Sequence, residues 1–116
     1  MHRRTLDREH ATIEYGVPSQ RNFPWPGVVD APFGSMWVML SEGMETDVDQ
    51  HADEEEVLVV MRGDGVLRID GEESAVHTGD ISYIPAGSQH TVRNDGSEEL
   101  VGLHIWWPRT AAATAP

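Results

Sequence analysis

The chain has 116 residues, a formal net charge of −12 and no cysteine. This length fits a single domain that buries roughly two thirds of its unfolded surface without cross-links. The lack of cysteine excludes disulfides, thiolate-bound metals and cysteine nucleophiles, so any metal must be bound through nitrogen and oxygen. The negative charge argues against nucleic acid as a partner, because phosphates are bound by clustered lysine and arginine.

Residues 1–34 are predicted to form an N-terminal arm. Its first ten residues are charged, and no stretch of the chain is long and apolar enough for a membrane span or a signal-peptide core. We therefore expect a cytoplasmic protein without a membrane partner. Residues 11–15 are predicted as a first strand. Residues 23–27 are predicted as an irregular apolar segment, because their prolines forbid a central strand, and we expect it to pack across one end of the domain or onto a partner.

Beyond the arm, glycine and proline punctuate short alternating runs rich in Val, Ile, Trp and Thr, which predicts an all-β fold. Turn residues such as Asp70-Gly71 and Asp95-Gly96 separate the runs. We expect one β-domain over residues 35–107 and a disordered tail over residues 108–116, where alanine and threonine dominate. The predicted strands are 35–40, 45–51, 56–61, 65–70, 73–77, 81–84, 91–93 and 100–107.

The first notable pattern is Gly43-x5-Asp49-x-His51-x4-Glu56-x6-Gly63. Asp49 and His51 lie two residues apart on a predicted strand, so their side chains point to the same face. Glu56 begins the next strand of the same hairpin and is expected to face them. The pattern therefore predicts a cluster of carboxylates and imidazoles.

The second pattern is Gly79-x5-Pro85-x-Gly87-x2-His90-x3-Asn94. Together the two patterns resemble the two cupin motifs: the second agrees at every position, and the first agrees except at one. The exception is Asp49, which stands where the motif has a histidine. The chain is thus similar to small single-domain bacterial cupins over about residues 35–107. The resemblance implies a jelly-roll barrel, also called a double-stranded β-helix.

The resemblance also implies a metal centre inside the barrel mouth. It assigns His51, Glu56 and His90 as ligands of a divalent ion such as Fe, Mn, Zn or Ni. Glu54 and Glu55 are expected to be solvated neighbours.

Three outcomes remain open for Asp49. It could bind the ion directly, bind it through a water, or leave a coordination position open. Direct binding gives two histidines and two carboxylates, a set that favours Mn, Fe or Zn. Two histidines and Glu56 alone resemble the facial triad of non-haem iron oxygenases, and Asp49 could then act as a catalytic base.

His104 lies on the last predicted strand, in phase with Trp106. It is either an ordinary core or surface histidine of the β-ladder, or a metal ligand or pocket acid/base that moves a proton, beside Asp49. For each tryptophan, the alternative to lining a substrate pocket is ordinary core packing. The residues predicted to line a substrate pocket are Trp37, Met39, Leu58, Val60 and Trp106.

The opposite face of the strand after Glu56 carries Val57, Val59 and Met61. An outward apolar stripe on a small domain is usually covered. Either the N-terminal segment or a second subunit can cover it, and the resemblance implies a homodimer.

The resemblance further implies a metal-dependent enzyme acting on a small organic substrate that chelates through oxygen. Dioxygenases, isomerases or lyases, decarboxylases and enzymes of small-molecule biosynthesis are the reaction types expected. The alternative is a non-catalytic cupin that binds or senses a small ligand.

Overall fold

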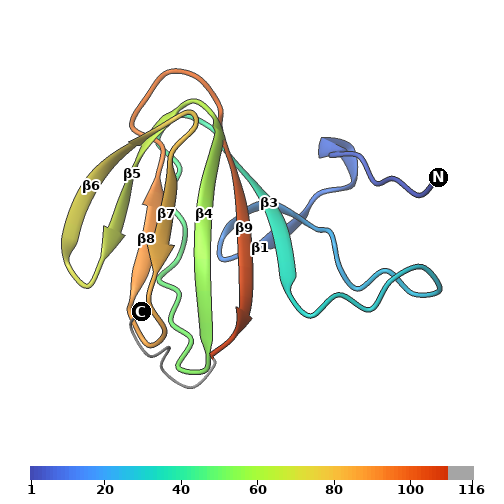
Figure 1. The fold of residues 1–116 in the computed structure, drawn as a ribbon. Coiled ribbons are helices and arrows are strands. Elements are labelled where there is room, and N and C mark those ends of the chain that lie inside the picture. The colour runs from blue at the N-terminus through green and yellow to red at the C-terminus, as the bar shows by residue number, and fades with distance from the viewer. Residues whose placement is uncertain (110–116) are drawn as a thin grey trace.

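The computed structural model describes residues 1–109, and β-strands dominate them (Figure 1). This confirms the predicted all-β class. Within these residues no helix has the length and apolarity that a membrane crossing would need. A short 3-10 helix, η1 (Arg8–His10), precedes the strands. In chain order these are β1 (Thr12–Glu14), β2 (Val17–Arg21), β3 (Gly34–Leu40), β4 (Glu54–Arg62), β5 (Asp64–Ile69), β6 (Glu72–His77), β7 (Ile81–Ile84), β8 (His90–Arg93) and β9 (Leu100–Pro108).

The strands form two antiparallel sheets, a six-stranded sheet in the order β1-β2-β3-β9-β4-β7 and a three-stranded sheet in the order β6-β5-β8. Alternating side chains of both sheets meet in one apolar core. On β4 the inward positions are buried, whereas the residues between them are only partly buried. The core cluster consists of Val17, Met36, Val38, Leu40, Leu58, Val60, Leu67, Val76, Ile84, Val92 and Leu100.

The N-terminal region takes a larger part in the fold than an arm would. β2 pairs along β3, with Ser19 opposite Val38, so the predicted boundary between residues 1–34 and 35–107 falls inside one sheet. β2 could not be predicted from the sequence because Pro18 lies within it. An edge position would tolerate proline, but β2 lies between β1 and β3 and its proline faces the short β1.

The loop over residues 22–33 projects away from the barrel beside the first residues of the chain (Figure 1). The Arg4 guanidinium lies 4.5 Å from the ring centroid of Trp25 and donates hydrogen bonds to the carbonyl oxygens of Asn22 and Pro24. Packing across one end of the domain is therefore wrong for residues 23–27, because they contact the N-terminal segment and Phe33; packing onto a partner stays a prediction. Of the predicted tail, residues 110–116 lie outside the described part of the chain.

The predicted strand over residues 45–51 is also wrong. This segment, named here the 44–53 segment, has only isolated bridges from Glu45 and Asp49 to β8. Its backbone amides bond in two directions, since Thr46 donates to Val92 of β8 while Asp47 donates to Tyr15 at the end of β1. Because these amides bond to two different parts of the chain, the segment forms no continuous ladder. It still runs beside β8.

Two motif residues have clear structural roles. Gly63 has a φ of +85°, and a Cβ atom there would lie 2.7 Å from the carbonyl oxygen of Glu99. Asn94 is fully buried, and its amide donates to the carbonyl oxygens of Leu40 and Glu98 at 2.8 Å each. Both residues therefore fix turns of the barrel and carry no chemistry of the site.

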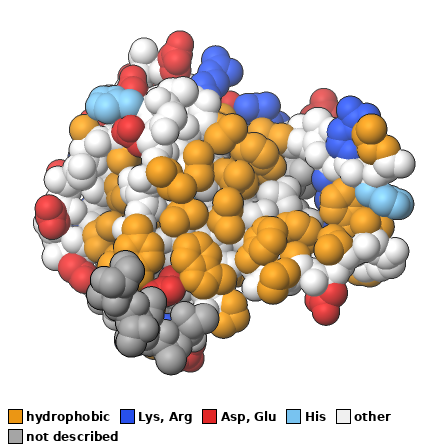
Figure 2. All heavy atoms as spheres, viewed as in Figure 1, with side chains coloured by type: hydrophobic (Ala, Val, Ile, Leu, Met, Phe, Trp, Pro, Cys, Tyr) orange, Lys and Arg blue, Asp and Glu red, His pale blue; other side chains and the backbone are white. Residues whose placement is uncertain are grey.

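The outer face of the large sheet is apolar, as predicted for Val57, Val59 and Met61. Hydrophobic side chains gather over the middle of the molecule in Figure 2, where Figure 1 has β4, β7 and β9. Ile81 of β7 is 67% exposed on this face. Water thus reaches a broad apolar surface.

Candidate functional site

One end of the barrel is hollow. The cavity there has a volume of about 130 Å³ and lies between the large sheet, β8 and the 44–53 segment. Its polar part is rich in carboxylates and imidazoles. The residues that line it are Tyr15, Val17, Arg21, Met36, Val38, Thr46, Asp47, Asp49, His51, Glu54, Glu56, His90, Val92, His104 and Trp106.

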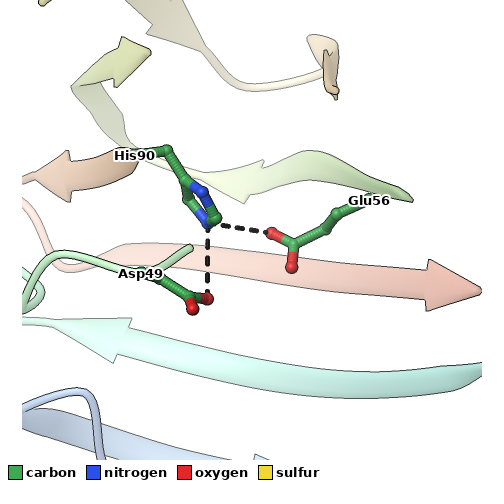
Figure 3. Close-up of side chains that lie close together, drawn as sticks. All are labelled: Asp49, Glu56 and His90. Atoms are coloured by element: carbon green, nitrogen blue, oxygen red, sulfur yellow. Dashed lines mark ion pairs between the residues drawn. The ribbon is translucent and has the colours of Figure 1, made fainter. Parts of the chain in front are cut away.

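Asp49, Glu56 and His90 form a close cluster in this cavity (Figure 3). Each offers one ligand atom, and these atoms all lie within 4.8 Å of one another. Glu56 comes from β4 and His90 from β8, so the two sheets each contribute one side chain. Asp49 is positioned by a pair of backbone hydrogen bonds with His90, at 3.0 and 2.9 Å.

The spacing inside the cluster fits a bound cation. His90 Nε2 lies 3.5 Å from Asp49 Oδ2 and 3.5 Å from Glu56 Oε2. These separations are too long for strong charge-assisted hydrogen bonds, so His90 forms only loose ion pairs with the two carboxylates, at a spacing that one bound ion could bridge. Two carboxylates and an imidazole suit borderline or hard divalent ions.

Glu56 also contacts the second predicted proton carrier. Its Oε2 lies 2.6 Å from Nδ1 of His104, and both side chains are buried. Burial opposes the charged form of Glu56, but the contacts with His104 and His90 outweigh it and lower the pKa of Glu56 to about 2. The carboxylate is therefore ionised and available to a cation.

Burial lowers the pKa of His90, whereas the neighbouring Glu56 and Asp49 raise it, and the net direction is upward. The Nδ1 atom of His90 is buried and has no hydrogen-bond partner among the described residues. His90 is thus held by packing and by the carboxylates in front of its Nε2.

His51, the fourth predicted ligand, lies beside the cluster. Its Nε2 is 2.7 Å from Asp49 Oδ1 and 3.0 Å from the hydroxyl of Tyr15, and its side chain is 40% exposed. Asp49 therefore turns one oxygen to His51 and the other to His90. Burial and the charge of Asp49 raise the pKa of Tyr15 to about 12, so its hydroxyl stays protonated.

The structure corrects two predicted pocket residues. Trp37 and Met39 do not line the cavity; Met36 and Val38, which alternate with them on β3, line it instead. The register explains the difference, because Met36 is paired with His104 of β9 and directly opposite residues share one face. Alternation defines the two sets, but only the pairing partner decides which set faces inward.

Leu58 and Val60 face inward as expected, at 1% and 2% exposure, but they belong to the packed core rather than to the cavity lining. Trp106 does line the cavity. Its indole packs over Gly34, where a Cβ atom would lie 2.2 Å from the ring, and the Arg21 guanidinium is 5.4 Å from its centroid. Trp106 is therefore fixed as one wall.

Several cavity residues have no counterpart among the predictions. Tyr15 and Arg21 come from the β1–β2 hairpin, and Asp47 comes from the 44–53 segment. Glu54, expected to be a solvated neighbour, also lines the cavity, whereas Glu55 accepts hydrogen bonds from Tyr83 and Trp107 on the outer face. The Tyr15-Gly16 pair was a usable signal, because a residue followed by glycine between two short strands is typical of a two-residue hairpin turn.

Comparison with known proteins identifies the barrel. A family model described as "Cupin domain" matches residues 36–106. A solved Cupin 2 conserved barrel domain protein from Salinispora arenicola CNS-205 is 34% identical in sequence and superposes with a TM-score of 0.85. The matched region covers 92% of this chain and 88% of that protein's chain. The plu4264 protein from Photorhabdus luminescens is 31% identical, with coverages of 90% and 85% and a TM-score of 0.82. The predicted jelly-roll barrel is thereby confirmed.

Among curated proteins, the oxalate-binding protein of Thermotoga maritima is 26% identical over 66 residues, which are 57% of this chain and 54% of that protein. The chain spans about half the length of the curated relatives it matches.

Proposed function

This chain belongs to the cupin domain family, and we propose that it is a metal-dependent enzyme acting on a small organic substrate that chelates through oxygen. One observation carries the proposal: Asp49, Glu56 and His90 present ligand atoms within 4.8 Å of one another inside a cavity. The two carboxylates and the imidazole converge from separate parts of the chain, and a cation bound among them would balance the negative charge of the carboxylates.

In this proposal Asp49, Glu56 and His90 hold a divalent ion such as Fe, Mn, Zn or Ni, with His51 beside them as a further ligand. When bound, the ion would polarise the oxygen donors of the substrate, or activate O₂ if it is iron. His104 donates a hydrogen bond from Nδ1 to the ionised Glu56 and is one candidate to move a proton; Asp49 is the other. Dioxygenase, isomerase or lyase, and decarboxylase chemistry all remain compatible with these roles.

The cavity lining supports a small substrate. A volume of about 130 Å³ admits a molecule of only a few heavy atoms. Val17, Met36 and Val38 contribute apolar side chains to its lining. The name of the Thermotoga maritima relative, oxalate-binding protein, fits a compact oxygen chelator of this size.

That name also favours a second candidate, a non-catalytic module that binds or senses a small ligand. The two candidates share the same cavity and metal centre and differ only in turnover. Oxalate is a suitable probe of this chelator class. An enzyme would convert a bound chelator of the class to product, whereas a binding module would release the chelator unchanged.

The test begins with metal analysis of the purified protein, followed by His90→Ala. We expect about one divalent ion per chain, and its loss in His90→Ala together with loss of oxalate binding by calorimetry. His77→Ala is the matched control, since His77 is exposed and lies outside the cavity. Wild-type protein that takes up no divalent ion, with oxalate binding unchanged by His90→Ala, would refute the metal-dependent reading of this site.

We also propose a homodimer that covers the outer face of the large sheet. Ile81, Tyr83 and Met61 are 67%, 51% and 47% exposed there. A second copy of the same face would bury these side chains. Sedimentation velocity at micromolar concentration tests this directly, and a purely monomeric protein would contradict it.

A further inference from the structure

Tyr15 occupies an unusual backbone position. It has a φ of +51°, and Gly16 after it has a φ of +77°. These two residues form the turn between β1 and β2, in which Glu14 pairs with Val17. Both angles are positive, as in a type I′ hairpin turn, whose first position favours Asn, Asp or Gly. A bulky aromatic residue at positive φ is an outlier, and such outliers are concentrated at functional sites.

The contacts of Tyr15 converge on the 44–53 segment. Its carbonyl oxygen accepts a hydrogen bond from Asp47 N at 2.8 Å, and its hydroxyl lies 3.0 Å from His51 Nε2. The two rings meet edge to face, at a centroid distance of 6.3 Å. Tyr15 therefore anchors this segment at two points, one through its backbone and one through its side chain.

His51 needs such an anchor. Its side chain is 40% exposed and belongs to a segment without a continuous ladder. Within residues 1–109, the only side chains that form a hydrogen bond or ion pair with it are Tyr15 and Asp49. Asp49 accepts and cannot donate, so the proton lies on His51 Nε2 and points between these two partners.

The orientation of Asp49 follows from this arrangement. Its Oδ1 is taken by His51 at 2.7 Å, which leaves Oδ2 to face His90 at 3.5 Å. A free aspartate carboxylate rotates readily about its last bond. The 2.7 Å contact with a fixed His51 opposes that rotation.

We propose that Tyr15 is a positioning residue of this site: its hydroxyl holds the His51 ring against Asp49 and so fixes the oxygen that Asp49 turns toward Glu56 and His90. The effect on ion binding rests on the proposed metal centre. The contact between Tyr15 and His51 does not depend on the metal centre, so it can be tested in the metal-free protein.

The chain offers a matched pair of variants, because it contains only two tyrosines. Tyr15→Phe removes the hydroxyl beside His51. Tyr83→Phe removes the hydroxyl that donates to Glu55 on the outer face, far from the cavity lining. Tyr15→Asn is a third variant that suits positive φ and keeps the turn while removing the phenol.

The first measurement is NMR of the histidine ring nitrogens in metal-free protein labelled with ¹⁵N. We expect Tyr15→Phe and Tyr15→Asn to shift the resonances of the His51 ring nitrogens, because both variants remove the hydroxyl 3.0 Å from Nε2, while His104 stays unchanged and Tyr83→Phe leaves every histidine unchanged. Near-ultraviolet circular dichroism checks that each variant is folded. His51 resonances that superimpose on those of the wild type in both Tyr15 variants overturn the proposal.

The second measurement is Zn²⁺ affinity by competition with a chelator. Loss of a residue that orients a ligand typically weakens metal binding by about 10-fold or more, so we expect at least that for Tyr15→Phe and no change for Tyr83→Phe. A shifted His51 with unchanged Zn²⁺ affinity overturns the link from His51 to Asp49. A wild-type protein that binds no divalent ion refutes the proposed function instead, and the NMR result then decides the role of Tyr15 alone.

Discussion

The two faces of β4 reverse the usual distribution of polarity. The inner face begins with Glu56, buried against His104, and continues into the packed core with Leu58 and Val60. The outer face carries Val57 and Val59 in partial contact with water. An ionised group on the inside must be paired, as Glu56 is with His104, and exposed apolar surface on the outside is unfavourable for an isolated domain. In the functions proposed above, a divalent cation would complete the inner face and a second subunit would cover the outer face.

The largest expected effect separates the packed inner positions from the outer ones. Leu58→Ala should lower the free energy of unfolding by about 2–5 kcal/mol, because the surrounding core cannot close around the lost atoms. Val59 is the next residue and lies on the other face, so Val59→Ala should lower the free energy of unfolding of the monomer much less. Urea unfolding at low protein concentration measures both, and equal losses would contradict the assignment of the faces.

The second prediction concerns acid. Since contacts in the folded protein lower the pKa of Glu56 from 4.5 to about 2, its ionisation stabilises the fold above pH 4.5, and this contribution is lost as the pH falls through about 2. The contribution is at most roughly 3 kcal/mol, since one pKa unit corresponds to about 1.4 kcal/mol.

Glu56→Gln should therefore flatten the loss of stability with acid between pH 4.5 and 2, as followed by urea unfolding at each pH. Glu55→Gln is the control, because Glu55 is the adjacent residue on the outer face. If both variants retain the wild-type acid dependence, Glu56 does not carry the effect.

The third prediction tests whether a divalent ion binds at the inner face of β4. A saturating divalent ion at about 100 times its dissociation constant should stabilise the wild type by about 2.7 kcal/mol. His90→Ala should abolish this gain, and His77→Ala should keep it. Thermal unfolding with and without Zn²⁺ gives the comparison, and equal stabilisation of His90→Ala would exclude His90 from the site.

The smallest expected effect belongs to the outer face. Ile81→Lys places a charge in the proposed dimer interface and should weaken dimerisation by about 10-fold or more, equivalent to about 1.4 kcal/mol. Glu72→Lys, on the exposed β6 of the small sheet, should leave the dimer intact. Sedimentation over a concentration series distinguishes the two variants, and identical dissociation constants would remove Ile81 from the interface.

Much of the fold was predictable because its signals are local. Alternation and turn residues located β7 at residues 81–84, as observed. The resemblance of the two glycine- and proline-containing patterns to the cupin motifs implied that Glu56 and His90 lie close together, as observed. These features depend on a few neighbouring residues.

The features that could not be predicted depend on pairing between distant strands. Tyr15 and Arg21 reach the cavity only because β2 pairs with β3. Trp37 was assigned to the wrong face because the phase of β3 is decided by its register with β9. Neither fact is encoded within a short window of sequence.

The position of β9 has a consequence for how the chain folds. It is the last described strand, yet it lies in the middle of the large sheet, between β3 and β4. Until β9 is added, β3 and β4 have no common partner and each presents an open edge. Contacts so distant in sequence slow folding, typically to milliseconds or seconds. On a translating ribosome, the Glu56–His104 pair and the sheet around it can therefore assemble only after residues 100–108 have emerged.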